Sequence, residues 1–545
     1  MTALLTDNLP LLAGAPNGIK KLRELILELA VRGKLVPQDP SDEPASELLK
    51  RIAEEKARLV AEGKIKNPKP LTRLKEEDQS DDFPEGWALS RLGEVVNICT
   101  GKLDANAAVP GGEYPFFTCS QTPSSIATYS FDTAAVLLAG NGDFNLKKFQ
   151  GRFDAYQRTY VIEPVIWSLD FCFISVSAEI ERITENNRGS AIPYLKLGDI
   201  TNPVIWMPPL AEQHRIVAKV DELMALCDRL ETQQADTESA HAELVQALLG
   251  SLTQAADAGD FAASWQRLAE HFHTLFTTES SIDALKQTLL QLAVMGKLVP
   301  QDPSDEPASE LLKRIAEEKA RLVAEGKIRK QKLLGEIAAQ EKPFVIPTHW
   351  EWVRLDSVLK KIGAGSTPLG GKQAYVADGV KFIRSQNVWN EGLRLNDVAF
   401  IPEKTHQKMS GTHVEAGDLL FNITGASIGR CAAVPPDFDT GNVSQHVTII
   451  RPVSGDTQPF LHVVLISQLV QQTVMDVQVG VSREGLSIGK LSQFLIPFPP
   501  EAEQHRIVAK VDQLMALCDK LKARLTQARQ LNAQLATALV EQAVA

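Results

Sequence analysis

Gly33–Ile65 reads GKLVPQDPSDEPASELLKRIAEEKARLVAEGKI, and Gly296–Ile328 repeats it letter for letter. The offset between the copies, 296 − 33 = 263, also pairs residues outside the identical block, such as Trp87 with Trp350. An identity of this length predicts a tandem duplication in which each copy begins an equivalent structural unit.

A second repeat closes each unit. Ala211–Asp221, AEQHRIVAKVD, returns as Ala502–Asp512, each shortly after a Pro-Pro pair and shortly before LMALCD. The offset here is 502 − 211 = 291, so the second copy carries 28 more residues between its repeated blocks. Constant ends around unequal inserts predict a repeated frame that holds two exchangeable heads.

The composition is that of a soluble globular protein, with 44% hydrophobic and 23% charged residues among 545. No apolar run approaches the roughly 18 residues that span a bilayer. The first residues, MTALLTDNLPLLAGAP, lack the basic flank and apolar core of a signal peptide. Six cysteines lie far apart without a CxxC pair, which argues against zinc ligands and disulfides. We therefore expect a cytoplasmic protein with no membrane contact and no metal site.

The net charge of −11 is unevenly distributed. Residues 349–498 hold 13 basic and 13 acidic side chains and residues 88–207 hold 9 and 12, so −8 of the charge lies outside these segments. Phosphate binding depends on Lys and Arg, and an acidic chain would ordinarily argue against a nucleic-acid partner. Because most of the acidity belongs to the repeated frame, the heads can still present basic surfaces.

Two helices are predicted at the start of each copy. Apolar residues recur every three or four positions from Ile19 to Val31, and Gly33 can end that helix. The turn PQDPSDEP follows, and a second helix is predicted over 45–62. We expect a helical hairpin within residues 1–66 and again within 254–328, where a further helix over 261–276 precedes it.

The segments between the repeats change to short β-branched and aromatic runs broken by Gly and Pro, such as YPFFTCS, RTYVIEP and HVTIIRP. Such runs predict strands. We expect an α+β fold with two strand-rich heads, head one over 87–207 and head two over 349–498. Polar linkers over 67–86 and 329–348 lead into them.

A long helix is predicted after each head, over 208–253 and 499–545. Its apolar residues alternate steps of four and three, which is typical of a coiled-coil seam. The first seam consists of Ile216, Val220, Leu223, Cys227 and Leu230, and the second of Ile507, Val511, Leu514, Cys518 and Leu521. We expect the two seams to pair with each other in an antiparallel coiled coil around a pseudo-twofold axis.

Motifs of DNA-modifying enzymes are missing from the sequence. A DNA methyltransferase would need Asn, Asp or Ser before Pro-Pro and an aromatic residue at its base-binding loop, but the Pro-Pro sites read MPPL, VPPD and FPPE. The glycine-rich segments GAGSTPLGG (363–371) and GASIG (425–429) lack the strand-to-helix context of a phosphate or dinucleotide site. Tight turns are the simpler interpretation of both.

What remains are polar and basic clusters beside aromatic residues in the heads. Arg can fork onto guanine and Asn or Gln onto adenine in the major groove, whereas Lys mainly neutralises phosphate. The candidate DNA-binding residues are Asn141, Lys147, Lys148, Arg152, Gln157 and Arg158 in head one, and Arg384, Ser385, Gln386, Asn387, Arg430, Gln445 and Arg483 in head two. The alternative for each cluster is a solvated loop.

These motifs together resemble the specificity (S) subunits of type I restriction-modification systems, over essentially the whole chain. The similarity is carried by LILELAVRGKLVPQ and its copy LLQLAVMGKLVPQ, by PPLAEQHRIVAKVDELMALCD and its copy, and by LLAGNGDF and GDLLFNITGASIGR in the heads. The resemblance implies a non-catalytic subunit whose two target-recognition domains read the halves of a split site in double-stranded DNA. It also implies that the helices dock two modification (M) subunits, which bring S-adenosylmethionine, while restriction (R) subunits bring ATP and Mg. No cofactor is expected in this chain.

Two other functions stay open on the sequence alone. A coiled-coil adaptor that never reads DNA would share the helical frame but would show no salt-sensitive DNA binding. A stand-alone DNA-modifying enzyme would methylate DNA without a partner subunit. The recognised bases are not predicted, because the loops that would read them differ between the heads.

Overall fold

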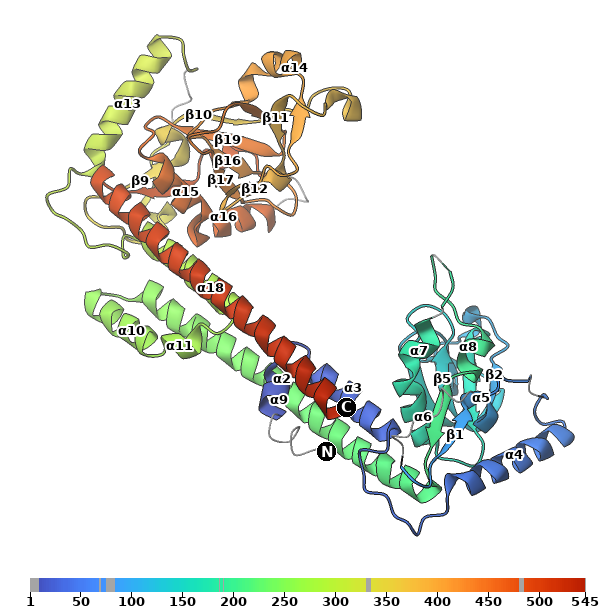
Figure 1. Ribbon diagram of the computed structural model, residues 1–545. Helices are drawn as coiled ribbons and strands as arrows, with labels where there is room; N and C mark the ends of the chain where they lie inside the picture. Colours follow the sequence, from blue (N-terminus) through green and yellow to red (C-terminus); the bar gives the residue numbers. More distant parts are fainter. Residues whose placement is uncertain are drawn as a thin grey trace. The chain divides into compact units, whose positions relative to one another are not determined.

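The structure, a computed structural model, describes residues 9–67, 70–74, 84–185, 187–189, 191–329, 335–479 and 485–544. It divides into two compact units: unit 1 consists of Met1–Glu238 and Gln527–Ala545, and unit 2 of Ser239–Thr526. Each unit contains one strand-rich head and part of the helical frame (Figure 1). The α+β fold with two heads and long helices is therefore confirmed.

Unit 1 holds head one. Its frame consists of α2 (Leu9–Gly14), α3 (Gly18–Val31), α4 (Ala45–Ala61), the first part of α9 (Leu210–Gln254) and the last part of α18 (Glu501–Val544). Its head consists of β1 (Ala88–Arg91), α5 (Leu92–Val95), β2 (Val96–Thr100), η2 (Ala105–Ala107), β3 (Tyr114–Phe117), β4 (Ser124–Ile126), β5 (Phe131–Ala139), β6 (Leu146–Ala155), β7 (Thr159–Pro164), α6 (Leu169–Ala178), α7 (Ile180–Glu185), α8 (Leu197–Thr201) and β8 (Val204–Met207).

Head one is built on a six-stranded sheet with the order β2-β7-β5-β6-β3-β4. Successive residues of a strand face opposite sides. Val136 and Leu138 of β5 accordingly pack with Phe171 of α6, whereas Leu137 packs with Phe153 of β6 on the other side. The first and last strands of the head, β1 and β8, pair antiparallel, so the chain enters and leaves head one at adjacent positions.

Unit 2 holds head two. Its frame consists of the last part of α9, α10 (Ala258–Glu270), α11 (Phe272–Leu275), α12 (Glu279–Val294), α13 (Ala308–Ala324) and the first part of α18. Its head consists of η3 (Ala339–Glu341), β9 (Glu351–Arg354), η4 (Leu355–Val358), β10 (Leu359–Ala364), η5 (Gly371–Ala374), β11 (Val380–Ile383), η6 (Ser385–Asn387), β12 (Val388–Trp389), β13 (Gly392–Leu393), β14 (Ala399–Ile401), α14 (Glu403–Lys408), η7 (Ser410–Thr412), β15 (His413–Val414), β16 (Leu419–Asn422), β17 (Cys431–Ala433), β18 (Gly441–Val443), β19 (Val447–Pro452), α15 (Gln458–Ile466), α16 (Gln468–Val479), α17 (Ile488–Leu491) and β20 (Leu495–Phe498).

Head two contains two four-stranded sheets, β10-β19-β16-β17 and β14-β11-β18-β15. Phe421 of β16 packs with Phe460 of α15 on one face of the first sheet, and Leu420 packs with Ile383 of the second sheet on the other. The first sheet is thus covered on both faces. β9 and β20 pair antiparallel and close head two as β1 and β8 close head one.

The predicted helical hairpin is wrong, although both of its helices form. In unit 1, α3 packs on α6, whereas α4 packs on α5 and β1 and leads away from α3 (Figure 1). Leu48 and Ile52 of α4 are buried, and Lys56 Nζ donates to the carbonyls of Gly93 and Val96 at 2.8 Å each. The apolar stripe of α4 is therefore covered by its own head, and α4 braces that head.

The two long helices pack antiparallel within each unit, as predicted, but a short helix shares their seam. In unit 1 Ile216, Val220, Leu223 and Cys227 are buried in one cluster with Leu22 and other residues of α3, and α18 adds only Ala536 and partly buried neighbours. In unit 2 Cys518 is buried with α12 and with the end of α9, and Leu514 and Leu521 pack against this cluster. Each unit thus forms a three-helix bundle in which a short helix covers most of the seam. Directly after the first seam, residues 231–240 of α9 are all exposed.

The residues shared by both copies meet where the frame joins the head. In unit 1 the buried carboxylate of Glu212 accepts hydrogen bonds from Trp87 Nε1 and Gln38 Nε2, both at 3.1 Å. Arg215 of the same helix pairs with Asp42, in the turn before α4, at 2.6 Å. The first repeat, the tryptophan and the AEQHR motif therefore form one joint.

The second copy repeats this joint in unit 2. Glu503 accepts hydrogen bonds from Trp350 Nε1 at 2.9 Å and Gln301 Nε2 at 2.7 Å. Arg506 pairs with Asp305 at 2.5 Å. Burial raises the pKa of Glu503 above its usual value, and the two hydrogen bonds partly oppose this shift.

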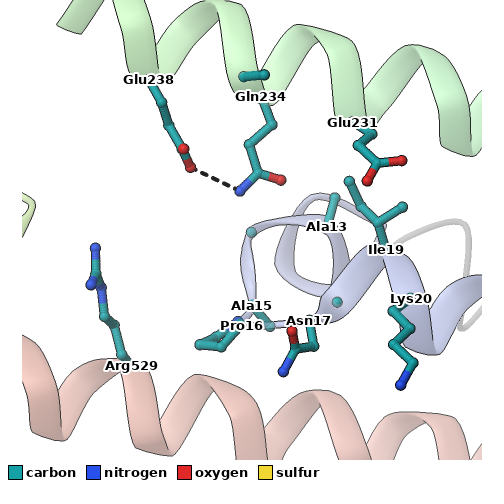
Figure 2. Close-up of a pocket in the computed structure, with 13 residues that line it drawn as sticks. Ala13, Ala15, Pro16, Asn17, Ile19, Lys20, Glu231, Gln234, Glu238 and Arg529 are labelled. Atoms are coloured by element: carbon teal, nitrogen blue, oxygen red, sulfur yellow. Dashed lines mark hydrogen bonds between the residues drawn. The ribbon is translucent and has the colours of Figure 1, made fainter. Parts of the chain in front are cut away.

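A cavity of about 520 Å³ lies in unit 1 beside the start of α3, between α9 and α18 (Figure 2). Its lining includes Lys20, Glu231 and Arg529. Glu231 also pairs with Arg23 of α3 at 2.6 Å. Charged side chains therefore border this part of the bundle in unit 1.

In unit 2 the equivalent charges are reversed. Lys522 stands at the repeat position of Glu231 and pairs at 2.8 Å with Asp283, which stands at the position of Lys20. We expect Glu231→Lys to weaken unit 1 by about 0.5–1 kcal/mol, because it places a lysine beside Arg23. Adding Lys20→Asp should recover part of this loss by creating the pair found in unit 2, and part only because it also removes the Lys20–Glu24 pair. Hydrogen exchange of the α3 amides measures both effects, and equal losses in the single and double variants would contradict the coupling.

Candidate nucleic-acid interface

Loops of head two meet at one end of its sheets: residues 384–387 after β11, 423–430 after β16 and 444–446 after β18. Asn422 Nδ2 donates to the Ser385 carbonyl at 2.9 Å, and the Ser444 N–H donates to the Ile383 carbonyl at 2.9 Å. We call the residues of these three loops the head-two loop cluster. It brings together Arg384, Ser385, Gln386, Asn387, Arg430 and Gln445, whereas candidate Arg483 lies outside the described residues.

The side chains of this cluster differ in what they offer to a ligand. Asn387 is fully buried: its Oδ1 accepts from the Arg384 N–H at 2.9 Å and its Nδ2 donates to the Arg394 carbonyl at 2.9 Å. This burial corrects the prediction that Asn387 binds DNA, because the amide is used to hold the loop. Gln386 is exposed and donates to Asp397 at 2.6 Å. Gln445 is exposed in the same cluster.

The segment GASIG forms the tight turn that leads to Arg430. Gly429 has a φ of +87°, and a Cβ there would lie 2.3 Å from Gln471 Oε1. The Asn422 N–H donates to the Arg430 carbonyl at 2.8 Å. This glycine is therefore explained by backbone geometry, and the turn sets the position of the arginine that follows it.

In head one, residues 118–121, 140–145 and 156–158 form a second group, which we call the head-one turn cluster. Lys147 Nζ donates to the Ser120 carbonyl at 2.7 Å, and the Gly140 N–H donates to the Arg158 carbonyl at 2.8 Å. Arg158 and Gln157 are exposed and line a cavity of about 300 Å³ together with Thr100, Gly140, Tyr160 and Leu195. Asn141 lies in the same cluster and is half-buried.

Three basic candidates of head one are engaged within the protein. The Lys147 ammonium is half-buried, which lowers its pKa. Lys148 pairs with Asp170 of α6. Arg152 pairs with Asp132 at 3.1 Å and lies over the Tyr129 ring at 4.9 Å. Arg152 is five residues from Lys147 along β6, or roughly 16 Å in a strand, so the structure does not place it in the turn cluster.

Sequence reasoning missed Trp389 and Arg394, which lie beside the head-two loop cluster. The guanidinium carbons of Arg394 and Arg430 lie 3.5 and 3.8 Å from the centre of the Trp389 ring. Trp389 follows the candidate run RSQN closely in the sequence. An aromatic residue beside polar candidates is the sequence signal that points to Trp389.

Among the described residues, no three His, Cys, Asp or Glu side chains converge as ligands of a metal ion would. In the same ranges no single helix is both long and apolar enough to cross a membrane, although the bent pair of α15 and α16 passes that test by length and composition.

The two repeated segments match the same known domain. Residues 84–237 and 347–529 each match the family described as the type I restriction modification DNA specificity domain. The chain belongs to this family. The specificity subunit of the Escherichia coli EcoAI type I restriction enzyme is 37% identical, over 97% of this chain and 94% of the relative. That of the E. coli EcoEI enzyme is 35% identical, over the same shares.

A solved structure, the HsdS subunit from Thermoanaerobacter tengcongensis, covers 85% of this chain and 97% of its own length. Its identity is 17% and its TM-score 0.37. The EcoAI and EcoEI relatives, which match over nearly their whole length, disfavour both a coiled-coil adaptor and a stand-alone enzyme.

Proposed function

We propose that this chain selects the DNA site of a type I restriction-modification complex, with each head reading one half of a bipartite site in the major groove. The observation that carries this proposal is the separate family match of each head, over 84–237 and 347–529. It is supported by the placement of Arg158 and Gln157 on turns of head one and of Arg430 and Gln445 on loops of head two. Arginine and glutamine have the donors and acceptors that distinguish guanine and adenine.

The chain acts as a targeting subunit in this proposal and carries out no reaction. The helical frame docks two modification subunits, which bind S-adenosylmethionine and methylate adenine. Restriction subunits join that complex and supply the ATP- and Mg-dependent steps. The proposal places the complex in the cytoplasm, where it meets duplex DNA.

Co-expression with the cognate modification subunit tests the proposal. We expect long-read sequencing to find methylated adenines in one bipartite site, and none when this chain is left out. The purified chain alone should transfer no methyl group from labelled S-adenosylmethionine to DNA. Methylation that does not depend on this chain would contradict the proposal, and methylation by the chain alone would favour an enzyme.

Arg158 and Arg152 provide a matched pair of variants. We expect Arg158→Ala to relax one position of the head-one half-site by about 1–3 kcal/mol, because that is the discrimination of a forked arginine–guanine contact. Arg152→Ala should leave every base preference unchanged, since Arg152 is held by Asp132 and Tyr129. Competition binding with single-base variants of the site measures both. A uniform loss over all sequences in Arg158→Ala would make it a phosphate contact.

A further inference from the structure

An arginine–tryptophan–arginine stack stands beside the head-two loop cluster. The guanidinium carbon of Arg394 is 3.5 Å and that of Arg430 is 3.8 Å from the centre of the Trp389 ring. At these distances one face of an indole has room for a single guanidinium, so the two groups cover opposite faces. The ring cannot stack on a nucleobase, because both of its faces are already occupied.

The tryptophan is held at its edge as well as its faces. Trp389 Nε1 donates to the Gln386 carbonyl at 2.8 Å. The Arg394 N–H donates to the Asn387 carbonyl at 2.9 Å, and the buried Asn387 side chain donates back to the Arg394 carbonyl at 2.9 Å. Residues 386–394 therefore form a rigid support for the two guanidinium groups.

The two arginines differ in their charge partners. Arg394 lies 3.9 Å from Glu391 in the same hairpin. Arg430 has no ion pair with any residue in the part of the chain that the structure describes. Its backbone is held in the loop cluster by Asn422, and its side chain is half-buried. Arg430 is thus an oriented cation whose charge is not neutralised by a described partner.

We propose that Trp389 and Arg394 clamp Arg430 so that it reads the O6 and N7 edge of a guanine in the head-two half-site. This inference rests on the proposed function. Stacking leaves the in-plane N–H groups of a guanidinium free, and a planar fork matches the two acceptors of guanine. Orienting the fork before binding lowers the ordering cost of the contact. Arg430 is then the base-reading residue, and Trp389 and Arg394 are positioning residues.

The test uses the full chain with its modification subunits and duplexes that carry each single-base change in the mapped site. We expect Arg430→Ala to reduce discrimination at one guanine of the head-two half-site by about 5- to 150-fold, as for other forked contacts. Arg430→Lys should not restore it, because an ammonium is a point charge. Trp389→Ala should weaken the same position, and Trp389→Ala with Arg430→Ala should be no worse there than Arg430→Ala alone.

Trp389→Phe keeps an aromatic face and should retain part of the discrimination. Head one provides an internal control, because its half-site should be unchanged in every variant. A uniform loss in Arg430→Ala, with a salt slope lower by about one, would make Arg430 a phosphate contact and overturn this inference. Full discrimination in Arg430→Ala would overturn it as well. If the unaltered complex shows no bipartite site, the proposed function itself fails.

If Trp389→Ala unfolds head two, seen as lost hydrogen-exchange protection of β16 and β19, Arg430→Ala and Arg430→Lys decide the inference. Both changes alter only the half-buried Arg430 side chain. The hydrogen bond that holds Arg430 in its loop is accepted by its backbone carbonyl and stays in place.

Discussion

Replacing residues 88–207 with head one of another specificity subunit should change one half of the methylated site completely and leave the other half intact. β1 and β8 pair with each other, so the exchanged segment begins and ends on adjacent strands. Trp87 and Glu212, which join the head to the frame, stay in place. Long-read mapping of methylated adenines measures the outcome.

The reciprocal exchange provides the control. Replacing residues 351–498, which begin on β9 and end on β20, should change only the other half of the site. A change in both halves after either exchange would show that the heads do not read DNA independently.

The helices of the frame could be predicted from the sequence, but the partners against which they pack could not. Periodicity places most of the helices within a residue or two, because an apolar face is a local property. The single helix predicted over 261–276 is instead two helices, α10 (Ala258–Glu270) and α11 (Phe272–Leu275). Which partner covers that face is not local. Leu48 and Ile52 of α4 pack on head one, and the seam residue Cys227 packs with α3. In each case the predicted partner and the actual partner are both apolar, so the sequence pattern alone could not choose between them.

The structure brings candidate residues together where they follow strands. Arg384 and Gln445 follow β11 and β18, which pair in parallel, so their loops meet at one end of the sheet. Lys148 and Arg152 lie within β6, and residues that are close in the sequence of a strand do not share the same surroundings. Their ion partners, Asp170 and Asp132, come from other elements and could not be read from the local sequence.

Glu503→Ala should lower the free energy of unfolding of unit 2 by about 2–4 kcal/mol. It leaves the buried Trp350 N–H without its acceptor, which costs about 1–3 kcal/mol, and it removes a packed side chain. Glu501→Ala is the matched control, because this first-turn carboxylate forms only a half-exposed pair with Arg314 at 3.1 Å. The control should cost less than about 1 kcal/mol. Urea titration followed by hydrogen exchange of residues in unit 2 measures both losses, and equal small effects would mean that the joint is not a stabilising contact.

Glu503→Gln separates the hydrogen bond from the charge. The glutamine carbonyl can still accept from Trp350, whereas the buried negative charge is gone. Burial raises the pKa of Glu503, so the folded protein holds this proton to a higher pH than the unfolded chain does. As pH rises from the ordinary carboxyl pKa through the folded one, the unaltered protein therefore loses stability that Glu503→Gln does not lose. The stability of Glu503→Gln relative to the unaltered protein should increase across this window and then stay constant. Parallel stability curves for the two proteins would contradict a burial cost at Glu503.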